Sequence, residues 1–145
     1  MGLDLIYFGS TSLAMQENLF EIIKFNQQGL IPAIVQDIKT NQILMMAWMN
    51  EESLLITIDT NFAHYFSRSR KKLWKKGETS NQTQEVKEIL VDCEGDCLIL
   101  KVEQSGVACH TGAKSCFFSS VVDKKYLKVN QEKLFTTKDL YDQKQ

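Results

Sequence analysis

The sequence predicts an α+β domain that is predominantly β, with mixed or antiparallel sheets and one or two short helices. Two observations predict this class. The apolar runs "AIVQDI", "ILMMAWM", "EVKEILV" and "CLILKVE" have the length of strands, and no more than two segments have a sound helical pattern. The 145 residues are 43% hydrophobic and 24% charged, an ordinary globular composition that suffices for one core.

A first helix is expected over about residues 13–28. Leu19, Ile22 and Ile23 recur there at helical spacing, and Gly29 then ends the pattern. The runs "AIVQDI" and "ILMMAWM" follow, separated by the turn-prone "KTNQ", so we expect them to form a β-hairpin.

Asn50 is expected to cap a second, short helix. Glu51 and Glu52 fall in its first turn, where carboxylates suit the helix dipole. The expected buried stripe of this helix consists of Leu54, Leu55 and Ile58.

The second half of the chain is expected to alternate strands and loops. "FAHYFS" reads as a strand, residues 68–83 as a long irregular loop, and "EVKEILV", "CLILKVE" and "CFFSSVV" as three further strands. Residues 123–145 are a polar, weakly patterned tail.

Charge and hydropathy limit the functional classes. The formal net charge is −1, so global basicity does not drive binding to a polyanion. No apolar run approaches the roughly 18 residues of a membrane helix, and no export signal is recognisable, so we expect a cytoplasmic protein without membrane contact. In that reducing compartment its four cysteines are expected to be metal ligands or buried thiols.

The segment "VDCEGDCLIL" concentrates candidate metal ligands. If it enters a strand, alternation points Asp92, Glu94 and Asp96 to one side and Cys93 to the other. Clustered carboxylates suit Mg²⁺, whereas a thiolate suits Zn²⁺. The alternative is an acidic turn built around Gly95.

Three thiols could form a catalytic zinc site with one open position, namely Cys93, Cys109 and Cys116. His110 adjoins the second of them and is a candidate proton carrier. Their spacing lacks C-x-x-C pairs, so simple core packing is the alternative. Cys97 is expected to be a small core residue or a minor neighbour of the metal.

The stretch "SRSRKKLWKKGETSN", residues 67–81, suits a phosphorylated ligand, because Arg and Lys bind phosphate and Trp stacks on a base. A solvated basic loop and a single-strand nucleic-acid site are the alternatives. The candidate substrate-binding residues are Arg68, Arg70, Trp74, Lys75, Lys76, Thr79 and Ser80.

These motifs together resemble the phosphoribosyl-AMP cyclohydrolase family of histidine biosynthesis. The segments "PAIVQD", "ILMMAWMN", "YFSRSRKKLWKKGETSN", "VDCEGDCLILKVEQ" and "ACHTGAKSCFF" occur in the family's order and spacing. The resemblance implies hydrolytic opening of the N1–C6 bond of 1-(5-phosphoribosyl)-AMP. It delimits a cyclohydrolase domain at residues 30–122, after a helical extension (1–29) and before the tail (123–145).

The resemblance also implies a homodimer whose active sites lie between subunits. It assigns zinc to Cys93, Cys109 and Cys116, shared across two subunits, and magnesium to Asp92, Glu94 and Asp96. Three residues depart from the family's usual pattern: Glu94 replaces Asp, Cys97 replaces Ala and Asn81 replaces Gly. The rival hypothesis is a zinc-stabilised nucleic-acid-binding module.

Overall fold

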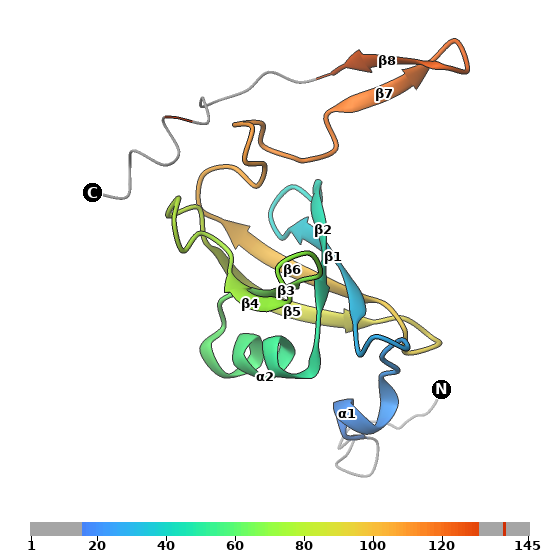
Figure 1. The fold of residues 1–145 in the computed structure, drawn as a ribbon, viewed down its shortest axis with the longest axis vertical. Helices are drawn as coiled ribbons and strands as arrows, with labels where there is room; N and C mark the ends of the chain where they lie inside the picture. Colours follow the sequence, from blue (N-terminus) through green and yellow to red (C-terminus); the bar gives the residue numbers. More distant parts are fainter. Residues whose placement is uncertain (1–15, 131–137, 139–145) are drawn as a thin grey trace.

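The computed structural model describes residues 16–130 and residue 138, and its centre is a four-stranded mixed sheet (Figure 1). The strand order is β2-β1-β6-β5. The strands are β1 (Ile31–Asp37), β2 (Ile43–Met49), β5 (Gln84–Val91) and β6 (Leu98–Gln104). The β1–β2 and β5–β6 pairs are antiparallel and β1 runs parallel to β6, so the expected α+β, predominantly β class is confirmed.

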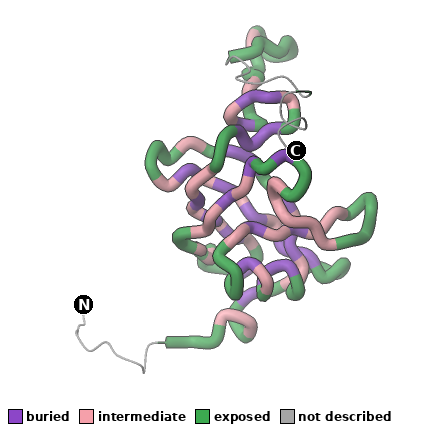
Figure 2. Tube along the Cα trace, turned by 90° about the vertical axis from the view of Figure 1, so that its left-hand side faces the viewer, coloured by how far each residue is buried: buried purple, intermediate pink, exposed green. Residues whose placement is uncertain are grey.

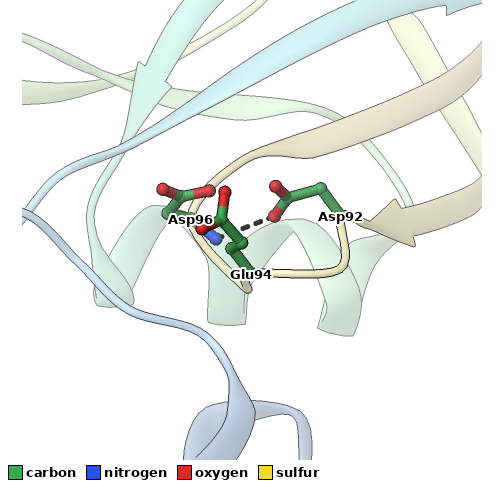
Figure 3. Close-up of side chains that lie close together, drawn as sticks. All are labelled: Asp92, Glu94 and Asp96. Carbon is green, nitrogen blue, oxygen red and sulfur yellow. Dashed lines mark hydrogen bonds between the residues drawn. The ribbon is translucent and has the colours of Figure 1, made fainter.

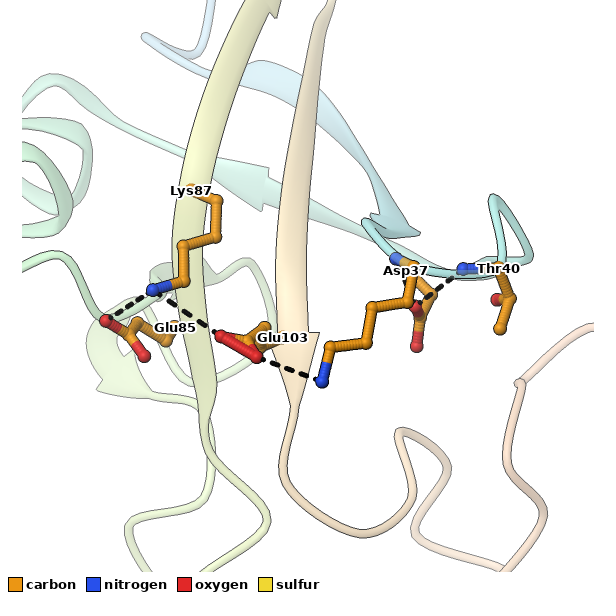
Figure 4. A network of polar contacts seen from close by, with 6 residues as sticks. Asp37, Thr40, Glu85, Lys87 and Glu103 are labelled. Atoms are coloured by element: carbon orange, nitrogen blue, oxygen red, sulfur yellow. Dashed lines mark hydrogen bonds and ion pairs between the residues drawn. The ribbon is translucent and has the colours of Figure 1, made fainter.

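The expected β1–β2 hairpin is confirmed, and Asp37 shapes its turn. One carboxylate oxygen, Oδ1, accepts hydrogen bonds from the backbone N–H of Lys39 at 2.8 Å and of Thr40 at 3.1 Å (Figure 4). Desolvation opposes ionisation of Asp37, but these donors prevail and hold its pKa below the usual range. Asn41 follows in the left-handed region, which asparagine tolerates in turns.

An ion-pair chain runs along the neighbouring strands β5 and β6 (Figure 4). Lys87 pairs with Glu85 at 3.0 Å and with Glu103 at 3.5 Å, and Glu103 also pairs with Lys39 at 3.3 Å. These side chains are between 38% and 76% exposed, so the pairs add little stability.

The core lies on one face of the sheet and is purple in Figure 2. On this face the sheet contributes Ala33, Val35, Leu98, Leu100 and Val102, all fully buried. They pack with Leu54 of the helix α2 (Glu51–Thr60) and Tyr65 of the strand β3 (His64–Ser67). Among the described elements, α2 and β3 therefore cover this face of the sheet.

The expected cap of α2 is confirmed, but its expected buried stripe is only partly right. The Asn50 side chain accepts from the Ser53 N–H at 2.8 Å, while the Ser53 hydroxyl accepts from the Asn50 N–H at 2.9 Å. Leu54 is buried, whereas Leu55 and Ile58 are exposed. The small residues Ser53 and Thr57 are buried in their place.

Thr57 explains why this face of α2 was selected. Its hydroxyl accepts from the backbone N–H of His64 at 2.9 Å, which attaches the helix directly to β3. Only a small polar side chain lets the α2 backbone come this close to β3 and also accept the hydrogen bond. The spacing of the leucine and isoleucine residues does not reveal such a contact.

The expected N-terminal helix is wrong in extent. Within the described residues only α1 (Leu19–Ile22) is helical, and residues 13–15 lie outside the described part. After Ile22 the chain leaves the helix because the Lys24 N–H donates to the Gly95 carbonyl at 2.7 Å. A tertiary hydrogen bond therefore replaces the next helical turn.

The expected irregular loop over residues 68–83 is also partly wrong. Its residues Lys72–Lys75 form strand β4, which pairs antiparallel with β3 to make a hairpin. The strand expected at "CFFSSVV" is shorter than expected, as β7 (Ser119–Val122), and it pairs with β8 (Tyr126–Val129) inside the polar tail.

Candidate functional site

The three candidate carboxylates converge in the turn that joins β5 to β6 (Figure 3). The segment is a turn rather than a strand, yet ligand oxygens of Asp92, Glu94 and Asp96 lie within 4.8 Å of one another. Within residues 16–130 and 138 this is the one group of three or more potential metal-binding side chains so arranged. Three exposed carboxylates at this spacing repel one another, and a bound cation would relieve that repulsion.

Asp92 builds this turn. Its Oδ1 accepts from the backbone N–H of Asp96 at 2.8 Å and of Cys97 at 3.1 Å. Desolvation works against ionisation, but the hydrogen bonds from the backbone N–H groups of Asp96 and Cys97 together outweigh it and lower the pKa of Asp92. Cys97 is half-buried beside it, and desolvation together with the charges of Asp92 and Asp96 raises the pKa of this thiol.

Gly95 allows the turn to contact the N-terminal segment. It has a positive φ of 74°, and a Cβ at this position would lie 2.6 Å from the carbonyl oxygen of Ile22. The backbone of residues 22–24 therefore fits against the turn only if residue 95 has no side chain.

Gly95→Ala is expected to destabilise the protein by about 1–3 kcal/mol, because it adds strain at a left-handed residue and a clash with fixed backbone. Denaturant unfolding checks this. Gly29→Ala is the matched control, because Gly29 has nearly the same φ, 75°, but nothing lies within 4 Å of its Cβ position. Equal losses for the two variants would show that the contact with Ile22 is unimportant.

Two of the three candidate zinc thiols lie together in the loop between β6 and β7. The Cys116 thiol is in side-chain contact with Cys109, and the Cys109 sulfur is 2.9 Å from the Thr111 hydroxyl. Burial and the neighbouring Cys109 raise the pKa of the Cys116 thiol to about 11, although the Lys76 ammonium opposes the shift. The Cys116 N–H donates to the Leu44 carbonyl at 2.7 Å, which fixes this loop at the start of β2.

The third thiol lies at the other end of the sheet. Cys93 is exposed in the acidic turn, next to where β1 begins, while Cys116 is attached near the start of the antiparallel strand β2. With a rise of about 3.3 Å per residue, these ends are on the order of 20 Å apart. One chain therefore does not bring Cys93 to the Cys109–Cys116 pair, whereas His110 adjoins that pair in sequence and is exposed.

Most of the predicted substrate-binding residues line one hollow of about 160 Å³ formed by β4 and the loop after it. The predicted residues that line it are Arg70, Trp74, Lys75, Lys76, Thr79 and Ser80. Gly77 is part of the same wall, but its missing side chain makes room for the backbone of Gln82 and Thr83 rather than for a ligand. Asn81 has φ 62°, a left-handed conformation that asparagine and glycine both accept.

Lys76 links this hollow to the thiol pair. Its Nζ donates to the Ala108 carbonyl at 2.8 Å, next to Cys109. Burial lowers the pKa of Lys76, while the thiolate charges of Cys116 and Cys109 would raise it. The basic loop and the thiol pair are therefore neighbours in the fold.

Arg68 lies apart from that hollow. Its guanidinium carbon is 5.0 Å from the ring centroid of Trp48, and both residues line a larger hollow of about 560 Å³. Its remaining lining residues are Asn26, Gln28, Leu30, Phe66 and Lys71.

Sequence reasoning missed three glutamines that position the site. Gln82 Oε1 accepts from the Val107 N–H at 2.8 Å, and Gln104 Nε2 donates to the Val107 carbonyl at 3.3 Å, so together they hold the thiol loop. Buried Gln84 donates to Gln104 Oε1 at 2.8 Å and accepts from the Tyr65 hydroxyl at 2.6 Å. Burial raises the pKa of Tyr65, so it remains a donor. For Gln84 and Gln104, a polar residue within an otherwise apolar strand pattern was the available signal; Gln82 precedes β5 and offered none.

Carboxylates arranged to hold a cation, together with a basic hollow suited to an anionic ligand, define the class as an α+β protein equipped for a metal ion and a phosphorylated small molecule. In the described part of the chain, no helix is long and apolar enough to cross a membrane. Residues 45–118 match the model of the phosphoribosyl-AMP cyclohydrolase family.

Curated relatives agree with this match. The chain is 46% identical to the phosphoribosyl-AMP cyclohydrolase of Chlorobium chlorochromatii over 93% of this chain and 98% of that protein. It is 59% identical to that of Trichormus variabilis over 74% of this chain and 95% of the relative, and 50% identical to that of Chlorobaculum tepidum over 87% and 92%. The chain belongs to the phosphoribosyl-AMP cyclohydrolase family.

Proposed function

We propose that this protein hydrolyses the N1–C6 bond of 1-(5-phosphoribosyl)-AMP, a step of histidine biosynthesis. Family membership supports the reaction. The observation that carries it in this chain is the basic hollow joined to a thiol pair through Lys76. The basic side chains of this hollow complement the negative charge of a nucleotide with two phosphates. The reacting carbon of that nucleotide would lie beside thiols able to bind a metal.

Zinc is the metal proposed for the thiols. Cys93, Cys109 and Cys116 supply three soft ligands, and their separation on one chain is met if Cys93 comes from the partner subunit of a homodimer. A zinc ion bound there would lower the pKa of a coordinated water to about 7. The acidic turn suits magnesium, since Asp92, Glu94 and Asp96 offer only oxygen ligands.

The chain's own residues bind the substrate and move protons in this proposal. Arg70, Lys75 and Lys76 bind phosphate oxygens, and the hydroxyls of Thr79 and Ser80 donate to them. Trp74 offers a face for the purine. Exposed His110, next to Cys109, takes up or returns a proton during ring opening.

The position of Arg68 supports a second contact with the substrate from the larger hollow, through its guanidinium group. The expected compartment is the cytoplasm, and residues 30–122 are expected to form the catalytic domain between the extension and the tail.

The purified protein is expected to hydrolyse phosphoribosyl-AMP. The absorbance change on ring opening measures the reaction, and bound zinc is measured on the same sample. His110→Asn should lower kcat by about 10²–10⁴-fold while zinc content stays unchanged, because only proton transfer is removed. The competing nucleic-acid-binding module predicts no turnover and binding to oligonucleotides that weakens steeply with salt. Such a result would replace the enzyme assignment.

A further inference from the structure

The β7–β8 hairpin stands apart from the rest of the protein (Figure 1). Among the described elements, β7 and β8 pair only with each other, and no other helix or strand packs extensively against them. An isolated two-stranded hairpin is marginally stable in water at best. This hairpin, called the arm below, therefore needs a surface to lie on.

One face of the arm is more apolar than the other. In the antiparallel register Val121 lies opposite Leu127, and Val129 lies opposite Ser119, so these side chains share a face. The other face is mixed, since it carries Ser120 opposite Lys128 and Val122 opposite Tyr126. The apolar side chains, with Phe117 just before the arm, are between 58% and 73% exposed: Phe117, Val121, Leu127 and Val129. A contiguous apolar patch of this kind marks an interaction surface.

The four-stranded sheet has a matching uncovered surface. Met46, Ile34, Ile99 and Leu90 are direct partners across all four strands, and they lie on the face opposite the core. Met46 and Leu90 are exposed. The described elements α2 and β3 contribute Leu54 and Tyr65 to the core on the other face, while at one end of the outer face the Arg68 guanidinium lies over Trp48.

We propose that the arm of one copy packs its apolar face on the outer sheet face of a second copy, and the reverse by two-fold symmetry. The proposal rests on the shared zinc site. The arm begins at Ser119, three residues after Cys116, whose N–H is bound to Leu44 at the sheet edge. Docking it across a partner's sheet carries Cys116 toward the partner's acidic turn.

Symmetry makes the second copy the natural occupant. The outer face lies between the acidic turn at one end of the sheet and the thiol loop at the other. Suppose that two copies face each other through their outer faces, with the two-fold axis between the sheets and perpendicular to the strands. The acidic-turn end of one sheet then lies over the thiol-loop end of the other. Each copy then covers the apolar arm face and the outer sheet face of the other. The Cys93 of each copy also approaches the Cys109–Cys116 pair of the other.

The test introduces one lysine on either face of the arm. Leu127→Lys is expected to raise the dimer dissociation constant roughly 10- to 100-fold, and the double variant V121K/L127K roughly 10²- to 10⁴-fold, because a charge replaces an apolar contact. The control Ser120→Lys puts the same charge on the opposite face and should leave the constant unchanged. Analytical ultracentrifugation over a dilution series measures all four proteins. An unchanged constant in V121K/L127K would overturn the proposal.

A photo-crosslinker locates the contact. Benzoylphenylalanine replaces Leu127 in ¹⁵N-labelled chains, which are exchanged with unlabelled chains before irradiation. Mixed-isotope crosslinks to peptides of β1, β2, β5 or β6 are expected; crosslinks within one chain, or to another surface, would overturn the arm assignment. A failure of the arm proposal can be distinguished from a failure of the proposed hydrolytic function. Turnover by a wild type whose arm crosslinks elsewhere rejects the arm alone, and an arm-linked dimer without turnover rejects the function alone.

Discussion

Mixing the inactive variants Cys93→Ser and Cys109→Ser is expected to restore activity to about a quarter of the wild-type value. In a mixed dimer, Cys93 of one chain meets Cys109 and Cys116 of the other, so one of two sites is complete. Random exchange makes about half of all dimers mixed, and half of their sites work. The structural reason is that Cys93 lies at the opposite end of the sheet from the thiol pair of its own chain.

Each variant alone should lose both zinc and turnover, because two thiolates hold zinc far more weakly than three. Metal analysis and the ring-opening assay measure the two losses. Cys97→Ser is the control, since Cys97 lies in the same turn as Cys93 but is half-buried beside Asp92. No recovery after verified subunit exchange, or an active monomer, would contradict shared sites.

Removing one carboxylate of the acidic turn is expected to make the enzyme depend on much higher magnesium. Glu94→Ala should raise the magnesium concentration for half-maximal activity by at least about 10–100-fold, because one of three converging oxygen ligands is lost. Glu94→Asp keeps the carboxylate and should stay close to wild type. The measurement is a magnesium titration of activity after mild chelation that leaves zinc bound.

Asp92→Ala separates metal binding from the structure of the turn. It should impair magnesium binding as Glu94→Ala does, and it should also lower the unfolding temperature without magnesium, since Asp92 accepts from two backbone N–H groups. Glu94→Ala should leave that temperature nearly unchanged. If the activity of both variants did not change with magnesium concentration, the magnesium site would have no part in the mechanism.

Local patterns in the sequence were sufficient for most of the fold. The hairpin of β1 and β2, the Asn50 cap of α2 and the two strands β5 and β6 all follow from periodicity, turn residues and capping chemistry. These signals act between residues close in sequence, and they can be read without knowing what packs where. The α+β class follows from them.

Where the expectations were wrong, a distant partner decided the outcome. The N-terminal helix stops at Ile22 because Lys24 bonds to Gly95, and α2 turns Thr57 inward because its hydroxyl bonds to His64. Residues Lys72–Lys75 form a strand because they pair antiparallel with the backbone of β3. Local propensity is weak beside such contacts.

For the site, the sequence by itself determined which chemistry is available: three acids, a set of thiols and a basic stretch with one tryptophan. Only the tertiary structure decided their arrangement. The acids converge because Asp92 and Gly95 close a turn, Lys76 reaches the thiol pair through the Ala108 carbonyl, and Cys93 is left at the far end of the sheet. Spacing along a chain specifies ligand types, but the distance between ligands depends on which strands pair and in which direction.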